Sequence, residues 1–247
     1  MFVLPYRDDN PTKKFPLFNR FLIALNVWVF FAYQFARDSS QQEAYFSTFG
    51  FIPHTFFGQV SNFSFEKSIW EWTTIFTSMF SHGGVLHLLG NMLFLYLFGD
   101  NVEDAMGRSR YLLFFLCCGT TAALTQGVSS PSSNIPMVGA SGAVSGVIGS
   151  YLLVYPRANI RVFYWFFIFV GTINLPAFLL LGFWVIEQFL ALPESMKGAG
   201  GVAIAAHLGG FGFGILMTPV FKKREVPLFQ KGLTRSFARK SRRFRRK

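Results

Sequence analysis

Long apolar stretches alternate with shorter polar segments along almost the whole chain. The apolar stretches cover about residues 18–35, 84–99, 111–127, 141–155, 162–192 and 202–221. A helix crosses the hydrocarbon of a bilayer with about 20 apolar residues, and shorter helices are tolerated where the bilayer thins. The pattern therefore predicts an all-α, polytopic membrane protein.

The fifth stretch is the exception, because its 31 residues are too many for one span and too few for two. The sequence Asn174-Leu175-Pro176 interrupts it, and proline fits well in the first turn of a helix. We therefore expect a helix over residues 176–192. The aromatic-rich segment before it, residues 161–173, should lie at the membrane interface or dip into it. This division leaves six spans in the chain.

The composition agrees with a membrane protein. Hydrophobic residues make up 51% of the 247 residues and charged residues only 14%, whereas soluble domains have about 25% charged residues. These proportions exclude a disordered chain and make a soluble enzyme a poor description. The two cysteines, Cys117 and Cys118, are adjacent in an apolar stretch and are best explained as small core residues.

Basic residues are distributed unevenly, and this predicts the orientation. The net charge is +11, and residues 222–247 carry twelve Lys or Arg against one acid, so the remainder of the chain is neutral. Basic residues favour the cytoplasmic side of a membrane. With both termini in the cytoplasm, the external segments hold only Arg37, Lys67 and Lys197. We therefore expect a multi-pass membrane protein with cytoplasmic termini. Since no transit peptide and no large soluble domain are apparent, we expect it in a bacterial plasma membrane.

These features divide the chain into a cytoplasmic N-terminal segment (1–17), a six-helix membrane domain (18–221) with a long external loop (38–81), and a basic tail (222–247). The tail should be disordered and should attract anionic lipid, at about 1 kcal/mol for each basic residue near the membrane. Nucleic-acid binding is a minor alternative for the tail. We do not expect nucleic acid to be a partner of a six-span protein.

Three polar sets lie inside predicted spans, where polar groups are costly and therefore mark candidate functional sites. They cover residues 82–91, 139–146 and 206–214, at the start of the second, fourth and sixth spans. With the predicted orientation, each set lies in the outer half of its span. The charge distribution, which is independent of these motifs, therefore places all three in one layer near the external face.

Small residues follow one face of two of these spans. Ser141 and Ser145 are four residues apart on the fourth span, and His207, Gly210 and Gly214 share a face of the sixth. Stripes of small residues let helices approach closely in lipid. This packing would bring Ser141 towards His207, and a hydroxyl within reach of an imidazole is a nucleophile with its base.

The same residues form recognisable motifs. His82, His87 and Asn91 make an HxxxxHxxxN pattern, GxSG surrounds Ser141, and AHxxGxxxG includes His207. Their order on the second, fourth and sixth spans resembles the rhomboid family of intramembrane serine proteases. The resemblance covers roughly residues 45–220.

The resemblance implies a six-helix core and cleavage of peptide bonds within or next to transmembrane helices of membrane-protein substrates. Ser141 would attack, His207 would be its base, and His87, Asn91 and the Ser141 amide would hold the oxyanion. The fifth helix and the loop after it would gate lateral access. No cofactor and no metal are implied. Accessory or structural roles are expected for His82, Gly139, Gly142, Gly210 and Gly214.

The chain departs from the family pattern at two points. Many members carry an aromatic residue one turn after the nucleophile, packed on the catalytic histidine, but this chain has Ser145 there. The departure leaves the orientation of His207 open. Many members also have a Trp-Arg pair in the first external loop, which we do not find. Glu187, in the outer half of the fifth span, is a minor candidate for a third residue that orients His207.

Other functions remain to be weighed against a protease. An inactive rhomboid-like protein that binds transmembrane clients is the main alternative, although inactive relatives typically lose the serine or the histidine. A small transporter is disfavoured because no internal repeat is apparent. A zinc site is disfavoured because the sequence has neither HExxH nor a Cys/His cluster.

Overall fold

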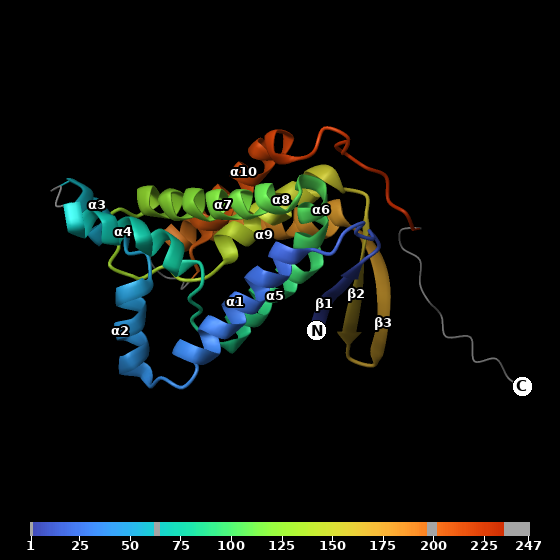
Figure 1. Ribbon diagram of the computed structural model, residues 1–247. Coiled ribbons are helices and arrows are strands. Elements are labelled where there is room, and N and C mark those ends of the chain that lie inside the picture. The colour runs from blue at the N-terminus through green and yellow to red at the C-terminus, as the bar shows by residue number, and fades with distance from the viewer. Residues whose placement is uncertain (1, 62–64, 197–201, 235–247) are drawn as a thin grey trace, which may run out of the picture.

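The computed structural model describes residues 2–61, 65–196 and 202–234. A helical bundle carries a three-stranded sheet at one end, called here the sheet end, and the short helices α3 and α4 at the other (Figure 1). The helices are α1 (Leu17–Tyr33), α2 (Ser39–Phe49), α3 (Pro53–Ser61), α4 (Phe65–Ser78), α5 (Val85–Phe94), α6 (Asp100–Met106), α7 (Arg108–Ser129), α8 (Ser141–Val154), α9 (Ala177–Met196) and α10 (Ile204–Phe221). The strands are β1 (Phe2–Asp8), β2 (Asn159–Phe166) and β3 (Phe169–Pro176).

The mainly helical, polytopic prediction is confirmed. A π-helical segment, η1 (Leu95–Gly99), joins α5 to α6, so that Val85–Met106 is one continuous helix. That helix, α7, α9 and α10 are long and apolar enough to cross a membrane, whereas α1 and α8 are shorter apolar helices. Each of these six helices lies at a predicted stretch.

Helix α8 lies at the centre of the bundle, where eleven of its fourteen residues are buried. It packs against α7 and α10, and small residues make this packing possible. A Cβ atom added to Gly210 or Gly214 would overlap the carbonyl oxygen of Gly142 or Gly146, respectively. The α8 and α10 backbones are therefore in direct contact, which fixes the relative position of their side chains.

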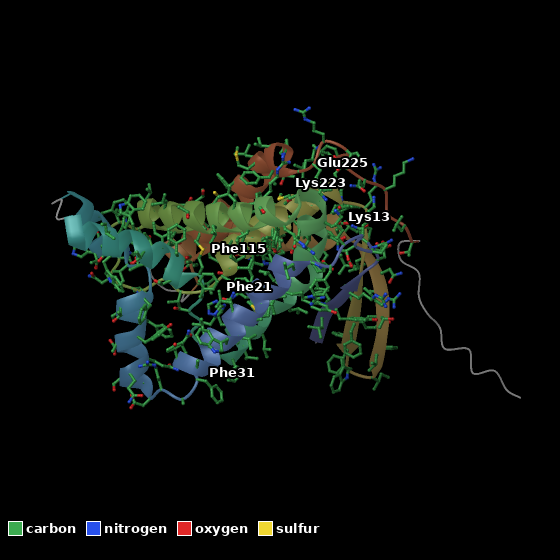
Figure 2. The ribbon with its side chains drawn as sticks, viewed as in Figure 1. Lys13, Phe21, Phe31, Phe115, Lys223 and Glu225 are labelled. Carbon is green, nitrogen blue, oxygen red and sulfur yellow. The ribbon has the colours of Figure 1, made fainter. Side chains whose placement is uncertain are left out.

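Side chains sort by environment along the bundle. Phe115 is fully buried between the helices, whereas Phe21 and Phe31 on α1 expose more than half of their surface (Figure 2). Exposed aromatic side chains on an apolar helix are suited to contact with lipid. The charged residues Lys223 and Glu225 lie at the sheet end, away from these apolar faces.

The predicted long loop of residues 38–81 contains three helices, α2 to α4. Asp38 caps α2 and forms a capping box with Gln41, which satisfies backbone N–H groups at the start of that helix. Phe51 and Phe56 are buried and pack with Ile75 of α4 into a second small core. This core attaches the short helices to α7, so the loop is a packed part of the structure.

The sheet is the feature that the hydrophobic pattern did not predict. The segment that we expected at the interface, residues 161–173, lies within an antiparallel β2–β3 hairpin that continues directly into α9. Strand β1, from the N-terminal segment, pairs antiparallel with β2. The β-rich composition of residues 160–170, with many aromatic and β-branched residues, favours strands. The pairing partner is more than 150 residues away, so no local pattern could reveal it.

Buried polar groups tie the sheet to the bundle. Asp8 accepts hydrogen bonds from the Tyr151 hydroxyl (2.9 Å) and from the Asn101 amide (2.8 Å). Asp9 accepts a bond from the Asn159 backbone N–H (2.8 Å) and also binds Thr234. These contacts join the two ends of the described chain to α6 and α8.

The basic tail is only partly as expected. Residues 222–234 fold back over the sheet end; for example, the Lys223 N–H donates to the Ala105 carbonyl (2.9 Å), and Gln230 donates to the Val154 carbonyl (2.8 Å). Disorder is therefore the wrong prediction for this part. The prediction for residues 235–247 lies outside the described residues.

Replacing Gly214 with Ala should lower the stability of the bundle, because the added methyl overlaps the Gly146 backbone and must push α10 away from α8. We expect a loss of about 1–3 kcal/mol, typical of overpacking. Thermal unfolding in detergent measures it. Gly212→Ala is the matched control, because open space surrounds Gly212. An equal loss in both variants would contradict the backbone contact.

The Asp8 carboxyl should make stability depend on pH. Burial, followed by repulsion from Asp100 and Asp9, raises the pKa of Asp8 to about 7, although its hydrogen bond from Tyr151 opposes the shift. Between about pH 4 and pH 7 the folded protein therefore binds a proton that the unfolded chain does not, so stability falls as pH rises through this window.

Asp8→Asn keeps a carbonyl oxygen for Tyr151 and Asn101 but cannot ionise. We expect the variant to be more stable than the wild type at pH 8, and the difference to shrink at pH 5. Paired thermal unfolding curves at the two pH values measure this difference. A difference that stays constant, or grows at low pH, would show that Asp8 is not protonated in the folded protein.

Candidate active site

A cavity of about 900 Å³ opens at the end of the bundle opposite the sheet. Residues from all three polar sets line it, among them His87, Asn91, Ser141 and His207. A smaller pocket of about 100 Å³ is also lined by Asn91, Ser141 and His207 and is bounded by α5, α8, α9 and α10. The fold thus brings together side chains that are up to 120 residues apart in the sequence.

Ser141 is the first residue of α8, two positions after Gly139, where the backbone bends. Gly139 has a φ of +125°, a backbone conformation that residues other than glycine rarely adopt. A Cβ atom there would lie 2.7 Å from the Cε1 and Nε2 atoms of His87 and 3.7 Å from the Ser141 Oγ. The glycine therefore provides both the turn and the space for His87 to lie close to Ser141.

The α5 residues are placed by contacts within their own segment. The Gly83 N–H donates to Nδ1 of His87 (3.3 Å), which leaves Nε2 on the side of Gly139. Asn91 is buried, and its amide donates to the His87 carbonyl (3.1 Å). His82 is buried with its ring edge-on to that of His87, at 5.2 Å between ring centres. The accessory or structural role of His82 stays a prediction.

His207 is held from α9. Its Nδ1 lies 2.7 Å from Oε1 of Gln188, and its ring centre lies 6.1 Å from that of Trp184 at an angle of 34°. Trp184 and Gln188 are four residues apart, so they occupy one face of α9. The helix thus supplies the aromatic neighbour that position 145 lacks, where the Ser145 hydroxyl instead donates to the Ser141 carbonyl (2.7 Å).

Neither Trp184 nor Gln188 is among the residues that the motifs predict for the site, and Glu187, the minor candidate for orienting His207, is the sequence neighbour of Gln188. Glu187 is exposed, whereas Gln188 is partly buried and contacts His207. A signal was available, because an uncharged polar residue inside an apolar span is also costly and also marks a functional site. Trp184 carried no comparable signal among the many aromatic residues of the chain.

The hydroxyl of Ser141 and the ring of His207 face shared space without a direct bond. Both line the large cavity and the small pocket, and no hydrogen bond joins them in the described part of the chain. Hydrogen bonds between catalytic groups are often long before substrate binds. Within residues 2–61, 65–196 and 202–234, no group of three or more His, Cys, Asp or Glu residues is placed to hold a metal ion.

The fold and the cavity define a helical integral membrane protein with a serine and a histidine at a shared pocket. The Rhomboid domain family model matches residues 69–224, which is more than half of the chain. The protein therefore belongs to the rhomboid family.

Two relatives have names that contain the word protease. The chain is 32% identical over 139 residues to rhomboid protease GluP of Bacillus subtilis, covering 56% of this chain and 25% of GluP. It is 34% identical over 84 residues to the putative rhomboid protease YdcA of the same organism, covering 34% and 42%. The chloroplastic rhomboid-like protein 11 of Arabidopsis thaliana is 29% identical over 162 residues, covering 62% and 53%. The matches thus span a quarter to about half of these relatives.

Proposed function

We propose that this protein is an intramembrane serine endopeptidase. It cleaves peptide bonds within or next to transmembrane helices of membrane-protein substrates, by means of a Ser141–His207 dyad. The observation that carries the proposal is the convergence of Ser141, His207 and His87 on one cavity of a rhomboid-family fold. The protease names of two relatives support the same reaction class.

The first step is attack of the Ser141 hydroxyl on the carbonyl carbon of the scissile bond. Nε2 of His207 takes the hydroxyl proton and later gives it to the leaving amine. Water then hydrolyses the acyl-enzyme with the same histidine as base. Acylation and deacylation each begin with a neutral His207 that carries its own proton on Nδ1, so that Nε2 can accept a proton.

Gln188 meets this requirement. Its side-chain carbonyl oxygen can only accept a hydrogen bond, so the 2.7 Å contact favours the tautomer with a proton on Nδ1 and a lone pair on Nε2. Trp184 packs beside the ring and limits its rotation. We assign both residues as positioning residues for His207.

The oxyanion of the tetrahedral intermediate needs preorganised donors. Because Nδ1 of His87 accepts the Gly83 N–H, neutral His87 carries its proton on Nε2, close to Gly139 and Ser141. The Ser141 N–H is at a helix start, where backbone donors lack partners within the helix. Asn91 has a second amide hydrogen besides the one bound to the His87 carbonyl. We assign these three groups to the oxyanion.

The small pocket beside the dyad gives the substrate a place for one side chain. Its volume of about 100 Å³ and its walls, which include Phe94, Val144 and Ile148, suit a small apolar residue. We place the site towards the external face, with both termini in the cytoplasm and the basic tail against anionic lipid. The division into residues 1–17, 18–221 and 222–247 follows the same topology.

Purified wild type should cleave a model transmembrane substrate in liposomes, whereas Ser141→Ala and His207→Ala should each lose at least about 10³-fold in rate. EDTA should have no effect. Cleavage that survives Ser141→Ala would exclude this nucleophile. If the wild type neither cleaves several substrates nor reacts with a serine-directed probe, the protein is a client-binding rhomboid relative without protease activity.

Variants at position 188 test the positioning role. Gln188→Leu removes the acceptor and should lower kcat at least about tenfold with little change in KM, because His207 loses its productive tautomer. Gln188→Glu keeps an acceptor and should restore much of the rate. It should also move the acid limb of the kcat profile to higher pH, because a carboxylate stabilises the protonated imidazole.

The matched control is Glu187→Gln, one position along α9 and exposed. It should leave kcat and the pH profile unchanged. A purely structural role for Gln188 would predict equal losses in the Leu and Glu variants and no shift of the profile.

A further inference from the structure

The turn of the β2–β3 hairpin carries a continuous apolar surface. Its six residues, Trp165–Val170, are called here the hairpin tip, and all of them are apolar and exposed. Phe167 and Ile168 expose 82% and 87% of their surface. Figure 1 shows the hairpin extending away from the bundle at the sheet end. An apolar patch of this kind marks contact with a membrane or with another protein.

The backbone of the turn points to a role for these side chains. Phe166 pairs with Phe169, so Phe167 and Ile168 alone form the loop. Phe167 has a φ of +51°, a conformation for which hairpin turns favour Gly, Asn or Asp. A bulky residue in this region is strained, and such strain persists where function requires it. The chain thus places an aromatic side chain at the tip at the expense of turn propensity.

The outer face of the sheet changes from basic to apolar towards the tip. Residues that pair across an antiparallel ladder point to the same face of the sheet, and so does every second residue along each strand. Arg7 pairs with Arg161 near the base, Leu4 pairs with Phe163 in the middle, and Trp165 pairs with Val170 at the tip. Two arginines directly opposite each other repel, so this pair favours an anionic ligand.

The opposite face anchors the hairpin to the bundle. Ile160 and Val162, near the base of β2, are buried in the main core, and exposure increases along the strand to Phe166. The hairpin is therefore held at its base and free of the bundle at its tip. Because β3 continues into α9, a helix that is long and apolar enough to cross a membrane, the base of the hairpin lies at one end of a candidate membrane span.

We propose that the hairpin tip inserts into the interfacial layer of the leaflet at the sheet end of the bundle, with Arg7 and Arg161 binding phosphate groups of anionic lipids. The order of these pairs matches the order of groups in a leaflet. The basic Arg7–Arg161 pair would lie at the phosphates, and the apolar pairs towards the tip would lie at the glycerol groups and the start of the acyl chains. Trp165 is suited to this layer. Its indole N–H donates to the Phe167 carbonyl (2.7 Å), which reduces the polar surface of the tip.

The geometry of the sheet limits how deeply the hairpin can enter the bilayer. A three-stranded sheet has two open edges, whose backbone N–H and C=O groups have no partners in hydrocarbon. Only the turn, where few such groups are unpaired, can pass below the headgroups. The hairpin is therefore an interfacial anchor and not a further span, and its insertion does not depend on the proposed proteolysis.

Fluorescence of Trp165 tests this placement in the full-length protein. One copy is placed in each lipid nanodisc of three parts phosphatidylcholine to one part phosphatidylglycerol, with acyl chains brominated near the headgroup or near the bilayer centre. The difference between wild type and Trp165→Phe isolates this residue from the other four tryptophans. We expect at least twofold stronger quenching by the shallow bromines than by the deep ones, and weak quenching by aqueous iodide.

Two asparagine variants separate insertion from folding. Phe167→Asn suits the left-handed turn and should keep the hairpin, but it should reduce bromine quenching of Trp165 at least twofold. Phe229→Asn is the matched control, because Phe229 is also exposed (61%) with a positive φ of 57° outside the hairpin. It should leave the quenching unchanged.

The role of the arginines is tested in the same nanodiscs. Arg7→Gln combined with Arg161→Gln should reduce the quenching to the value that the wild type shows in phosphatidylcholine alone. Quenching of Trp165 by iodide and not by bromine would place the tip in water and overturn the proposal. Protection from both quenchers that appears only with two copies per nanodisc would assign the surface to a second copy of the chain instead.

Discussion

Direct contact between the α8 and α10 backbones is the constraint on which the remaining structure depends. Gly142 and Gly146 of α8 lie against Gly210 and Gly214 of α10, where a single methyl group would overlap a carbonyl oxygen. Hydrophobic burial gives little specificity inside a bilayer, so close packing must select the arrangement of helices. Because the two backbones touch, the first turn of α8 and the first turn of α10 face the same cavity. Ser141 and His207 share a pocket as a result of this contact.

A second helix determines how His207 is presented. Trp184 and Gln188 approach the imidazole from α9, and this helix has fewer contacts with the bundle than α10. The aromatic neighbour and the hydrogen-bond acceptor therefore come from an element different from those that carry the serine and the histidine. Any displacement of α9 would change both contacts at once. Under the proposed function, the position of α9 would thus control the tautomer of the base together with the width of the small pocket.

The two ends of the bundle have different chemistry. The cavity lies at one end, and the other end carries the sheet, the folded part of the tail, and the partly buried carboxyl of Asp8. Asp8, Asp9, Asn101 and Thr234 connect segments from both ends of the described chain. The hairpin projects from this connected region with a basic base and an apolar tip. An anchor in this position would restrain the start of α9, since β3 and α9 are continuous.

The hydrophobic pattern by itself determined the helical class and the positions of the six apolar helices, because these depend on local runs of apolar residues and on the cost of polar groups in lipid. The motif spacing also selected Ser141, His207, His87 and Asn91, and the structure places all four at one cavity. Only the tertiary structure decided three further features: the β1–β2 pairing, the contact of Gln188 with His207, and the folding of residues 222–234 over the bundle. Each of these joins residues on separate elements through a few hydrogen bonds. Such bonds depend on how the helices are rotated and placed, and that arrangement is set by packing across the whole bundle, beyond any local pattern.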